Sequence, residues 1–172
     1  MTRQQMEQIY DKYHLSVYRL AFAYCKNRAD AEDITSDVFL KRFEMDPAFT
    51  DGRHETAWMV RVTANRAKDL LRSFRYRFIV PLDEADLVYQ SPEESTVYHA
   101  VMELPAKYRA VIHLYYYEGY SVAEIAEMTD TSETAVQTQL YRARKILKGK
   151  LGEELNWNEN SGLLQGHGQR ST

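Results

Sequence analysis

The chain has 172 residues, of which 44% are hydrophobic, and its formal net charge is −3. This length holds one domain or two small ones, no apolar run reaches the roughly 18–20 residues that span a bilayer, and the first residues contain no apolar signal core. A single cysteine, Cys25, excludes an internal disulfide and a cysteine-based zinc cluster. We therefore expect a cytoplasmic protein without stable membrane insertion, with Cys25 buried as a structural thiol.

Residues 1–78 are predicted to form three helices. The first covers about residues 3–25. The second runs over about residues 30–44, with Asp30 as its cap. A proline and a glycine mark residues 45–55 as a loop. The third and longest helix follows at about residues 56–76.

The third predicted helix carries basic residues on one face. At 100° per residue these positions share a narrow strip, made of Arg61, Asn65, Lys68, Arg72 and Arg75. One interpretation is a solvated basic face. The other is a face that follows a phosphate backbone, with the amide of Asn65 available to read a base. Trp58, near the start of the helix, is either a core anchor or a residue that stacks on a nucleobase, and the core anchor is the simpler interpretation.

Residues 79–95 are predicted to be a linker, because they contain two prolines, five acidic residues and no basic residue. Much of the negative charge is therefore in the linker, while residues 1–78 and 96–151 each carry a small basic excess. Local charge is what a phosphate backbone senses. The polar, glycine-rich residues 152–172 are predicted to be a disordered tail.

Residues 96–151 are predicted to form two helices, near 96–103 and 106–118, followed by a helix-turn-helix at 121–148. Ser121 and Glu124 have the spacing of a capping box at the start of its first helix. Ser132 is placed to cap the second helix after a break at residues 129–131.

The second helix of this motif has two distinct sides. The inward side is an apolar stripe of Val136, Leu140, Ala143 and Leu147. The outward side consists of Thr134, Thr138, Tyr141, Arg142 and Lys145. Such a helix offers polar and cationic groups to a major groove. A surface hairpin with a solvated charged face is the other interpretation.

Three strings of this sequence resemble bacterial sigma factors of the extracytoplasmic-function group. The promoter-binding domain of that family resembles EGYSVAEIAEMTDTSETAVQTQLYRARKILK, its promoter-melting helix resembles TAWMVRVTANRAKDLLRSFRYR, and its helix that grips the clamp of core RNA polymerase resembles DAEDITSDVFLKRF. The resemblance covers about residues 8–150 and implies an all-α fold of two small helical domains joined by the acidic linker, the C-terminal one containing the helix-turn-helix.

The resemblance also implies roles for individual residues. Asn65 matches a position that holds a base flipped from the −10 element, and residues 45–55 match the loop that shapes the pocket for that base. The positions that would face the polymerase clamp are Asp33, Asp37, Lys41 and Arg42. Those that would face the −35 element include Gln137, Thr138, Tyr141 and Arg142. The expected partners are core RNA polymerase, duplex and single-stranded promoter DNA, and an anti-sigma factor.

Departures from the family pattern keep two alternatives open. Many members have Arg or Lys where this chain has Gln137 and Gln139, and glycine is common where it has Asp130. A stand-alone helix-turn-helix regulator, or a sigma-like protein that binds polymerase without promoter activity, therefore stays possible. An enzyme is disfavoured, because the histidines are scattered without ligand spacing, and no catalytic residue, metal or cofactor is expected.

Overall fold

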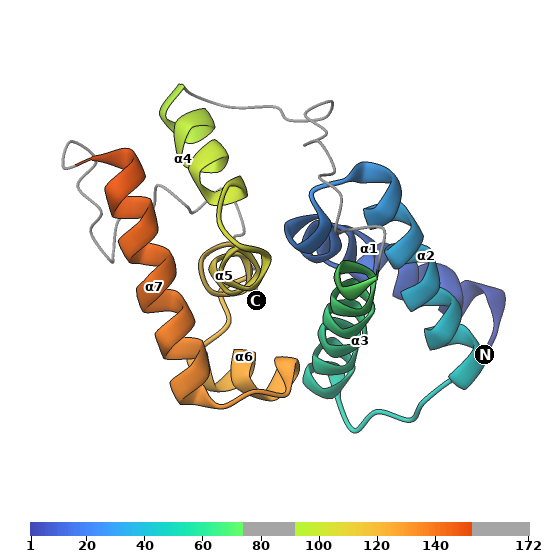
Figure 1. Cartoon of the computed structure of the whole chain (residues 1–172). Coiled ribbons are helices and arrows are strands. Elements are labelled where there is room, and N and C mark those ends of the chain that lie inside the picture. The colour runs from blue at the N-terminus through green and yellow to red at the C-terminus, as the bar shows by residue number, and fades with distance from the viewer. Residues whose placement is uncertain (74–91, 153–172) are drawn as a thin grey trace. The chain divides into compact units, whose positions relative to one another are not determined.

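The computed structural model describes residues 1–73 and 92–152 of the chain, with side chains in the second range described from residue 96 onward. All regular structure within these ranges is helical (Figure 1). The chain divides into two compact units. The N-terminal unit is built on α1, α2 and α3, and the C-terminal unit on α4 to α7.

The N-terminal unit consists of three helices: α1 (Arg3–Cys25), α2 (Arg28–Met45) and α3 (Gly52–Arg72). Each helix contacts the other two. Their shared core is lined by apolar side chains that include Val17, Leu20, Ile34, Val38 and Met59. Cys25 is buried in this core and its thiol donates to the carbonyl of Ala21, so its prediction as a structural thiol is confirmed.

The boundary between α1 and α2 differs from the prediction. Lys26 ends α1 in the left-handed conformation, and Asn27 caps α2 by accepting a hydrogen bond from the backbone N–H of Asp30 at 3.0 Å. Asp30 itself lies in the first turn and is 1% exposed. Asn and Asp are equally good N-caps. Because Asn27 and Asp30 are close together in the sequence, the residue type alone did not show which of them caps α2.

The loop between α2 and α3 is shorter than predicted. α2 ends at Met45 and α3 already begins at Gly52, because Asp51 accepts a hydrogen bond from the N–H of His54 at 2.8 Å and caps the helix. The first turn of α3 therefore includes Glu55, which the prediction had left in the loop. Leu70, near the end of α3, is half-buried. The predicted continuation of this helix to residue 76 lies outside the described residues.

The C-terminal unit contains α4 (Pro92–Met102), α5 (Ala106–Ile112), a π-helix (His113–Tyr117), α6 (Val122–Thr129) and α7 (Glu133–Leu151). α4 starts within the range predicted as linker, which is a correction to that boundary. The rest of the predicted linker, and the tail from residue 153, lie outside the described residues. Buried Arg109 fixes the corner between α4 and α5, because its guanidinium donates to the carbonyls of Met102 and Leu104.

The helix-turn-helix is confirmed in detail. The hydroxyl of Ser121 accepts from the N–H of Glu124 at 3.2 Å, and the Glu124 carboxylate accepts from the N–H of Ser121 at 2.8 Å. Ser132 caps α7 by accepting from the N–H of Ala135. Asp130, at the turn, has a φ of 55°, a left-handed conformation that Asp tolerates better than most residues.

Candidate nucleic-acid interface

The outer side of α3 carries the predicted row of basic residues. Arg61, Asn65 and Arg72 are exposed, while Lys68 and Trp58 are half-buried. Arg75 lies outside the described residues. The inner side of the same helix is made of small or apolar buried residues, which are Met59, Thr63, Ala64 and Ala67. The helix therefore separates a packed side from a polar, cationic side along most of its length.

Small inner side chains let α3 lie close to its neighbours. Thr63 is fully buried, and its hydroxyl donates to the carbonyl of Met59 at 2.7 Å, which satisfies its polar atom within the helix. Ala64 and Ala67 add little bulk to the contact. Close packing of the inner side leaves the outer side as the part of α3 that can meet a ligand.

Trp58 is in contact with the loop that precedes α3. Its indole packs against the ring of Phe49 with a centroid separation of 5.9 Å, and Phe49 also makes an edge contact with His54 at 5.2 Å. The half-buried Trp58 therefore anchors the loop through Phe49, whereas the prediction of a core anchor is not met, because Trp58 is not among the buried core residues. Stacking of its remaining surface on a base stays a prediction.

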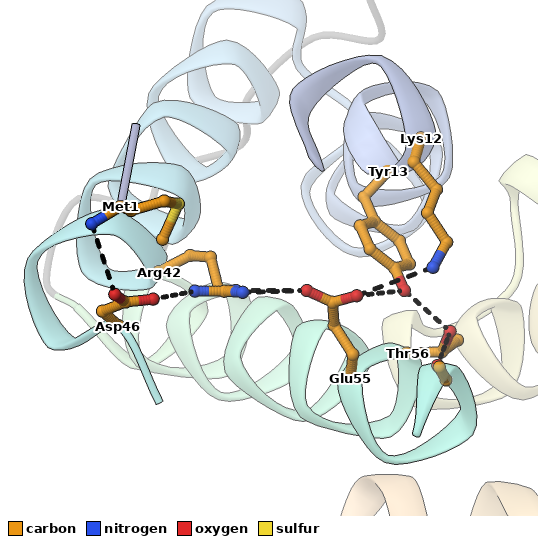
Figure 2. Close-up of polar contacts among 8 residues, drawn as sticks. Met1, Lys12, Tyr13, Arg42, Asp46, Glu55 and Thr56 are labelled. Carbon is orange, nitrogen blue, oxygen red and sulfur yellow. Dashed lines mark hydrogen bonds and ion pairs between the residues drawn. The ribbon is translucent and has the colours of Figure 1, made fainter. Parts of the chain in front are cut away.

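A network of charged and hydroxyl groups joins the three helices of the N-terminal unit near the first turn of α3 (Figure 2). Glu55 is at its centre. One carboxylate oxygen accepts from the guanidinium of Arg42 at 2.9 Å, and the other accepts from the hydroxyl of Tyr13 at 3.0 Å. Lys12 is 3.5 Å from the second oxygen. These contacts tie the first turn of α3 to α1 and α2.

The surroundings of Glu55 keep it ionised. Burial by itself would raise the pKa of this carboxyl group, but the hydrogen bonds from Arg42 and Tyr13 and the charges of Lys12 and Arg42 outweigh that effect. The pKa of Glu55 therefore lies below its ordinary value. The carboxylate remains charged at neutral pH and holds its partners in place.

Four residues of α2 were predicted to face the polymerase clamp, and the structure separates them. Asp33 and Lys41 are exposed, and Asp37 is half-buried. Arg42 is 5% exposed, and its guanidinium is paired with Glu55 and, at 3.3 Å, with Asp46. The assignment of Arg42 to an exposed partner-binding face is therefore wrong, because this side chain is part of the interior network.

The sequence did not point to two further residues, one on the outer side of α2 and one on α3 that contacts it. Leu40 is 56% exposed beside Lys41, although it is a large apolar residue. Arg66 on α3 forms an ion pair with Asp37 at 2.6 Å. The spacing of Leu40 from Asp33 and Asp37 places all three on one side of α2, which is the signal that could have identified it.

The outer side of α7 presents the residues predicted to face DNA. Thr134, Gln137, Arg142 and Lys145 are exposed, Tyr141 is 64% exposed, and Thr138 is half-buried. The predicted inward stripe of Val136, Leu140, Ala143 and Leu147 is buried. Both sides of the helix are therefore as predicted, although contact of the outer residues with DNA stays a prediction.

Arg144 was not singled out by the sequence analysis, yet it fixes the orientation of α7. Its guanidinium donates to the hydroxyl of Tyr116 at 2.7 Å and lies over the rings of Tyr115 and Tyr116, each 5.6 Å from the ring centroid. Arg contacts of this kind combine a hydrogen bond with stacking. Arg144 therefore belongs to the packing of the unit, whereas Arg142 points to solvent.

In residues 1–73 and 92–152, no three His, Cys, Asp or Glu side chains are grouped so that they could hold a metal ion. Within the same ranges, no helix is both long and apolar enough to cross a membrane. The candidate site consists of the exposed polar faces on α3 and α7.

Comparison with known proteins identifies both parts of the chain. Residues 9–77 match the family model of sigma-70 region 2, and residues 95–147 match that of sigma-70 region 4. The fold is shared with the sigma factor RpoE of Bartonella quintana, solved in complex with the anti-sigma factor NepR. That match has a TM-score of 0.74 and 20% identity and covers 89% of this chain and 99% of RpoE.

Two curated relatives extend the comparison. The chain is 33% identical over 158 residues to the ECF RNA polymerase sigma factor BldN of Streptomyces coelicolor, and this match covers 85% of the chain but only 60% of BldN. It is 30% identical over 143 residues to the RNA polymerase sigma factor SigV of Bacillus subtilis, covering 80% of the chain and 85% of SigV. This chain therefore belongs to the extracytoplasmic-function (ECF) group of RNA polymerase sigma factors.

Proposed function

We propose that this chain is an alternative sigma factor that binds core RNA polymerase, directs it to promoters and opens the promoter DNA. In this proposal it acts in the cytoplasm and has no catalytic activity of its own. An anti-sigma factor is a further proposed partner, by analogy with the NepR complex of RpoE. Membership of the ECF group supports the assignment. The exposed polar faces of α3 and α7 are the surfaces proposed to contact promoter DNA.

The observation that carries the proposal is the outer face of α3. Exposed Arg61 and Arg72 suit contacts with phosphates, whereas Asn65 lies between them as an uncharged amide. Cations alone would hold a backbone, but an amide has a donor and an acceptor that can address the edge of a base. Pairing in a duplex hides the Watson–Crick edges of the bases, so an amide that reads such an edge needs a strand that has been unpaired.

The two DNA-facing helices suit different forms of DNA. α7 ends a helix-turn-helix and presents neutral polar groups together with Arg142 and Lys145, which is the composition of a helix that reads a major groove. α3 presents a cationic row with one amide. A chain with both surfaces can bind a duplex element and then hold a melted strand.

The outer side of α2 is proposed to bind the polymerase. After the correction for Arg42, this surface consists of Asp33, Asp37, Leu40 and Lys41. Exposed Leu40 supplies apolar area for the centre of an interface, and the charged groups around it suit its polar rim. The ion pair between Asp37 and Arg66 ties this surface to α3.

Substitution of Asn65 tests the proposal. Asn65→Ala should leave binding to core polymerase and to closed promoter DNA nearly unchanged. Open-complex formation should be impaired, and the permanganate reactivity of unpaired thymines should fall. A template with a pre-melted bubble should restore much of the activity, because the cost of unpairing, which is a few kcal/mol, has then been removed.

A matched control is Gln4→Ala, which removes an exposed amide from α1 and should behave as the wild type. If Asn65→Ala opens duplex promoters as well as the wild type does, the role assigned to this residue is wrong. If the wild-type protein with core polymerase opens no promoter, the chain is instead a regulator that binds duplex DNA by itself or a polymerase-binding protein without promoter activity.

A further inference from the structure

A single guanidinium, that of Arg42, contacts both ends of the segment between α2 and α3. It donates to Glu55 in the first turn of α3, at 2.9 Å and 3.3 Å, and it is 3.3 Å from the carboxylate of Asp46, the residue that ends α2. It also covers the ring of Phe49, 4.9 Å from its centroid. Arg42 therefore contacts the start of the loop at Asp46, its middle at Phe49 and the helix that follows it at Glu55.

The loop (residues 46–51) is held at further points. Phe49 packs against His54 and Trp58. The N–H of Thr50 donates to Nδ1 of His54 at 3.4 Å, and Asp51 caps α3. Buried Arg42 lies at the centre of these contacts, which attach the loop to the first turns of α3.

The loop borders the DNA-facing side of α3. Trp58 and Asn65 are seven positions apart, close to two turns of about 3.6 residues each, so they lie on the same side of the helix. The ring of Phe49 packs against Trp58 and therefore lies at the end of the strip that carries Asn65. Aromatic rings beside cationic groups are the usual surroundings of an unstacked base.

We propose that Arg42 is a positioning residue that sets which unstacked nucleobase the protein accepts, by holding Phe49 and the loop against Trp58. This inference rests on the proposed function, because it concerns the same melted strand. Arg42 does not touch the base. A guanidinium is planar, so it can stack on Phe49 while it donates to Glu55 and Asp46, whereas the ammonium of a lysine cannot do all three.

The test compares base selectivity in Arg42→Lys and wild type. Both proteins are assembled with core polymerase on pre-melted templates of a promoter found by mapping transcription starts, and each position of the unpaired strand is varied through the four bases. Arg42→Lys should lower the ratio between the preferred base and the others about tenfold at one position, the size of one discriminating contact. Core binding should be retained.

A second variant keeps the test informative if Arg42→Lys folds poorly. Phe49→Leu preserves apolar volume but removes the ring that Arg42 covers, and it should reduce selectivity at the same position. The double variant should lose no more selectivity than the stronger single one, because the two residues act through one contact. Val17→Ala, at a buried position of α1 outside the charged network and the loop residues, is the control that lowers stability while selectivity stays intact.

The outcomes separate this inference from the proposed function. If the wild type selects a base and both single variants select it equally well, the role of Arg42 is overturned and the proposed function stands. If Val17→Ala loses selectivity to the same degree, the effect is one of general stability and the inference is again overturned. If the wild type forms no complex on any pre-melted template, the proposed function itself fails.

Discussion

The two units hold the helices that are proposed to contact DNA, α3 and α7, by different interactions. In the N-terminal unit, α3 packs through small residues, and its first turn is fixed by the partly buried charged network around Glu55, which includes buried Arg42. In the C-terminal unit, α7 is held by an apolar stripe that includes Leu140 and Leu147. Removing one member of a charged network leaves a buried charge behind, whereas truncating an apolar side chain leaves a cavity. The two units should therefore respond to different substitutions.

The largest effect is expected when the charged network is broken. Glu55→Ala should lower the free energy of unfolding of the N-terminal unit by about 4 kcal/mol, because it leaves Arg42 buried without its main partner. Urea unfolding can be followed by the fluorescence of Trp58 in a Trp157→Phe background, since the chain has two tryptophans. Glu7→Ala, which removes one member of the exposed Arg3–Glu7 pair, is the matched control and should change little.

The same carboxylate predicts a dependence on pH. The pKa of Glu55 is lower in the folded protein than its ordinary value of 4.5, so the folded state binds the proton less well than the unfolded state does. Its contribution is present above the unfolded pKa and is lost as the pH falls through the folded pKa. The wild type should therefore lose more stability on acidification than Glu55→Gln. Equal acid sensitivity of the two proteins would show that the network is not stabilising.

A cavity in the C-terminal unit should have the next largest effect. Leu140 is almost completely buried on α7, and Leu140→Ala should lower the free energy of unfolding by about 3 kcal/mol. The loss should appear in the far-ultraviolet circular dichroism transition while the midpoint seen by Trp58 fluorescence stays in place. Tyr141→Ala, at the adjacent exposed position, should leave stability nearly unchanged. A shift of both transitions by Leu140→Ala would mean that the units do not unfold independently.

A smaller effect is expected on DNA binding by α7. Arg142→Ala should weaken binding of the polymerase complex to its upstream promoter element by about 2 kcal/mol, the size of a lost base contact. Lys148→Ala removes the same charge from the exposed last turn of α7 and should weaken specific and random duplex alike. Equal losses on both duplexes for Arg142→Ala would show that this residue touches only phosphates.

The smallest effect concerns the cap of α6. Ser121→Ala removes the side chain that accepts from the N–H of Glu124 and should cost about 1 kcal/mol of stability. Ser121→Asp should restore most of it, because Asp is also a good N-cap. Thermal unfolding of the wild type and the two variants provides the comparison. If Ser121→Ala unfolds at the same temperature as the wild type, the cap does not contribute to the stability of this motif.

The helix-turn-helix was predictable because its signals lie within one short stretch of sequence. The reciprocal cap of Ser121 and Glu124 involves residues three positions apart, and the buried stripe of α7 follows helical spacing. Local spacing determines both features, so the sequence alone was enough to place them. The exposed row on α3 followed from the same periodicity.

The network around Arg42 was not predictable from such signals. Its partners lie on other helices: Glu55 is in α3 and Tyr13, which shares that carboxylate, is in α1. The resemblance to sigma factors grouped Arg42 with Asp33 and Lys41, but in the tertiary packing this side chain is buried. The ion pair of Asp37 with Arg66 was missed for the same reason. At the start of α2 the difficulty was different, because Asn27 and Asp30 are chemically equivalent as caps.

The π-helix at His113–Tyr117 has a consequence for the length of the chain. The N–H of Glu118 donates to the carbonyl of His113 at 3.0 Å, five residues earlier, so this turn contains one residue more than a turn of α-helix. Deleting one residue here would let α5 continue as a regular helix up to the turn that leads to Ser121. Among the helices of the C-terminal unit that the structure describes, this segment is the place where a homologous chain one residue shorter would fit with the least rearrangement.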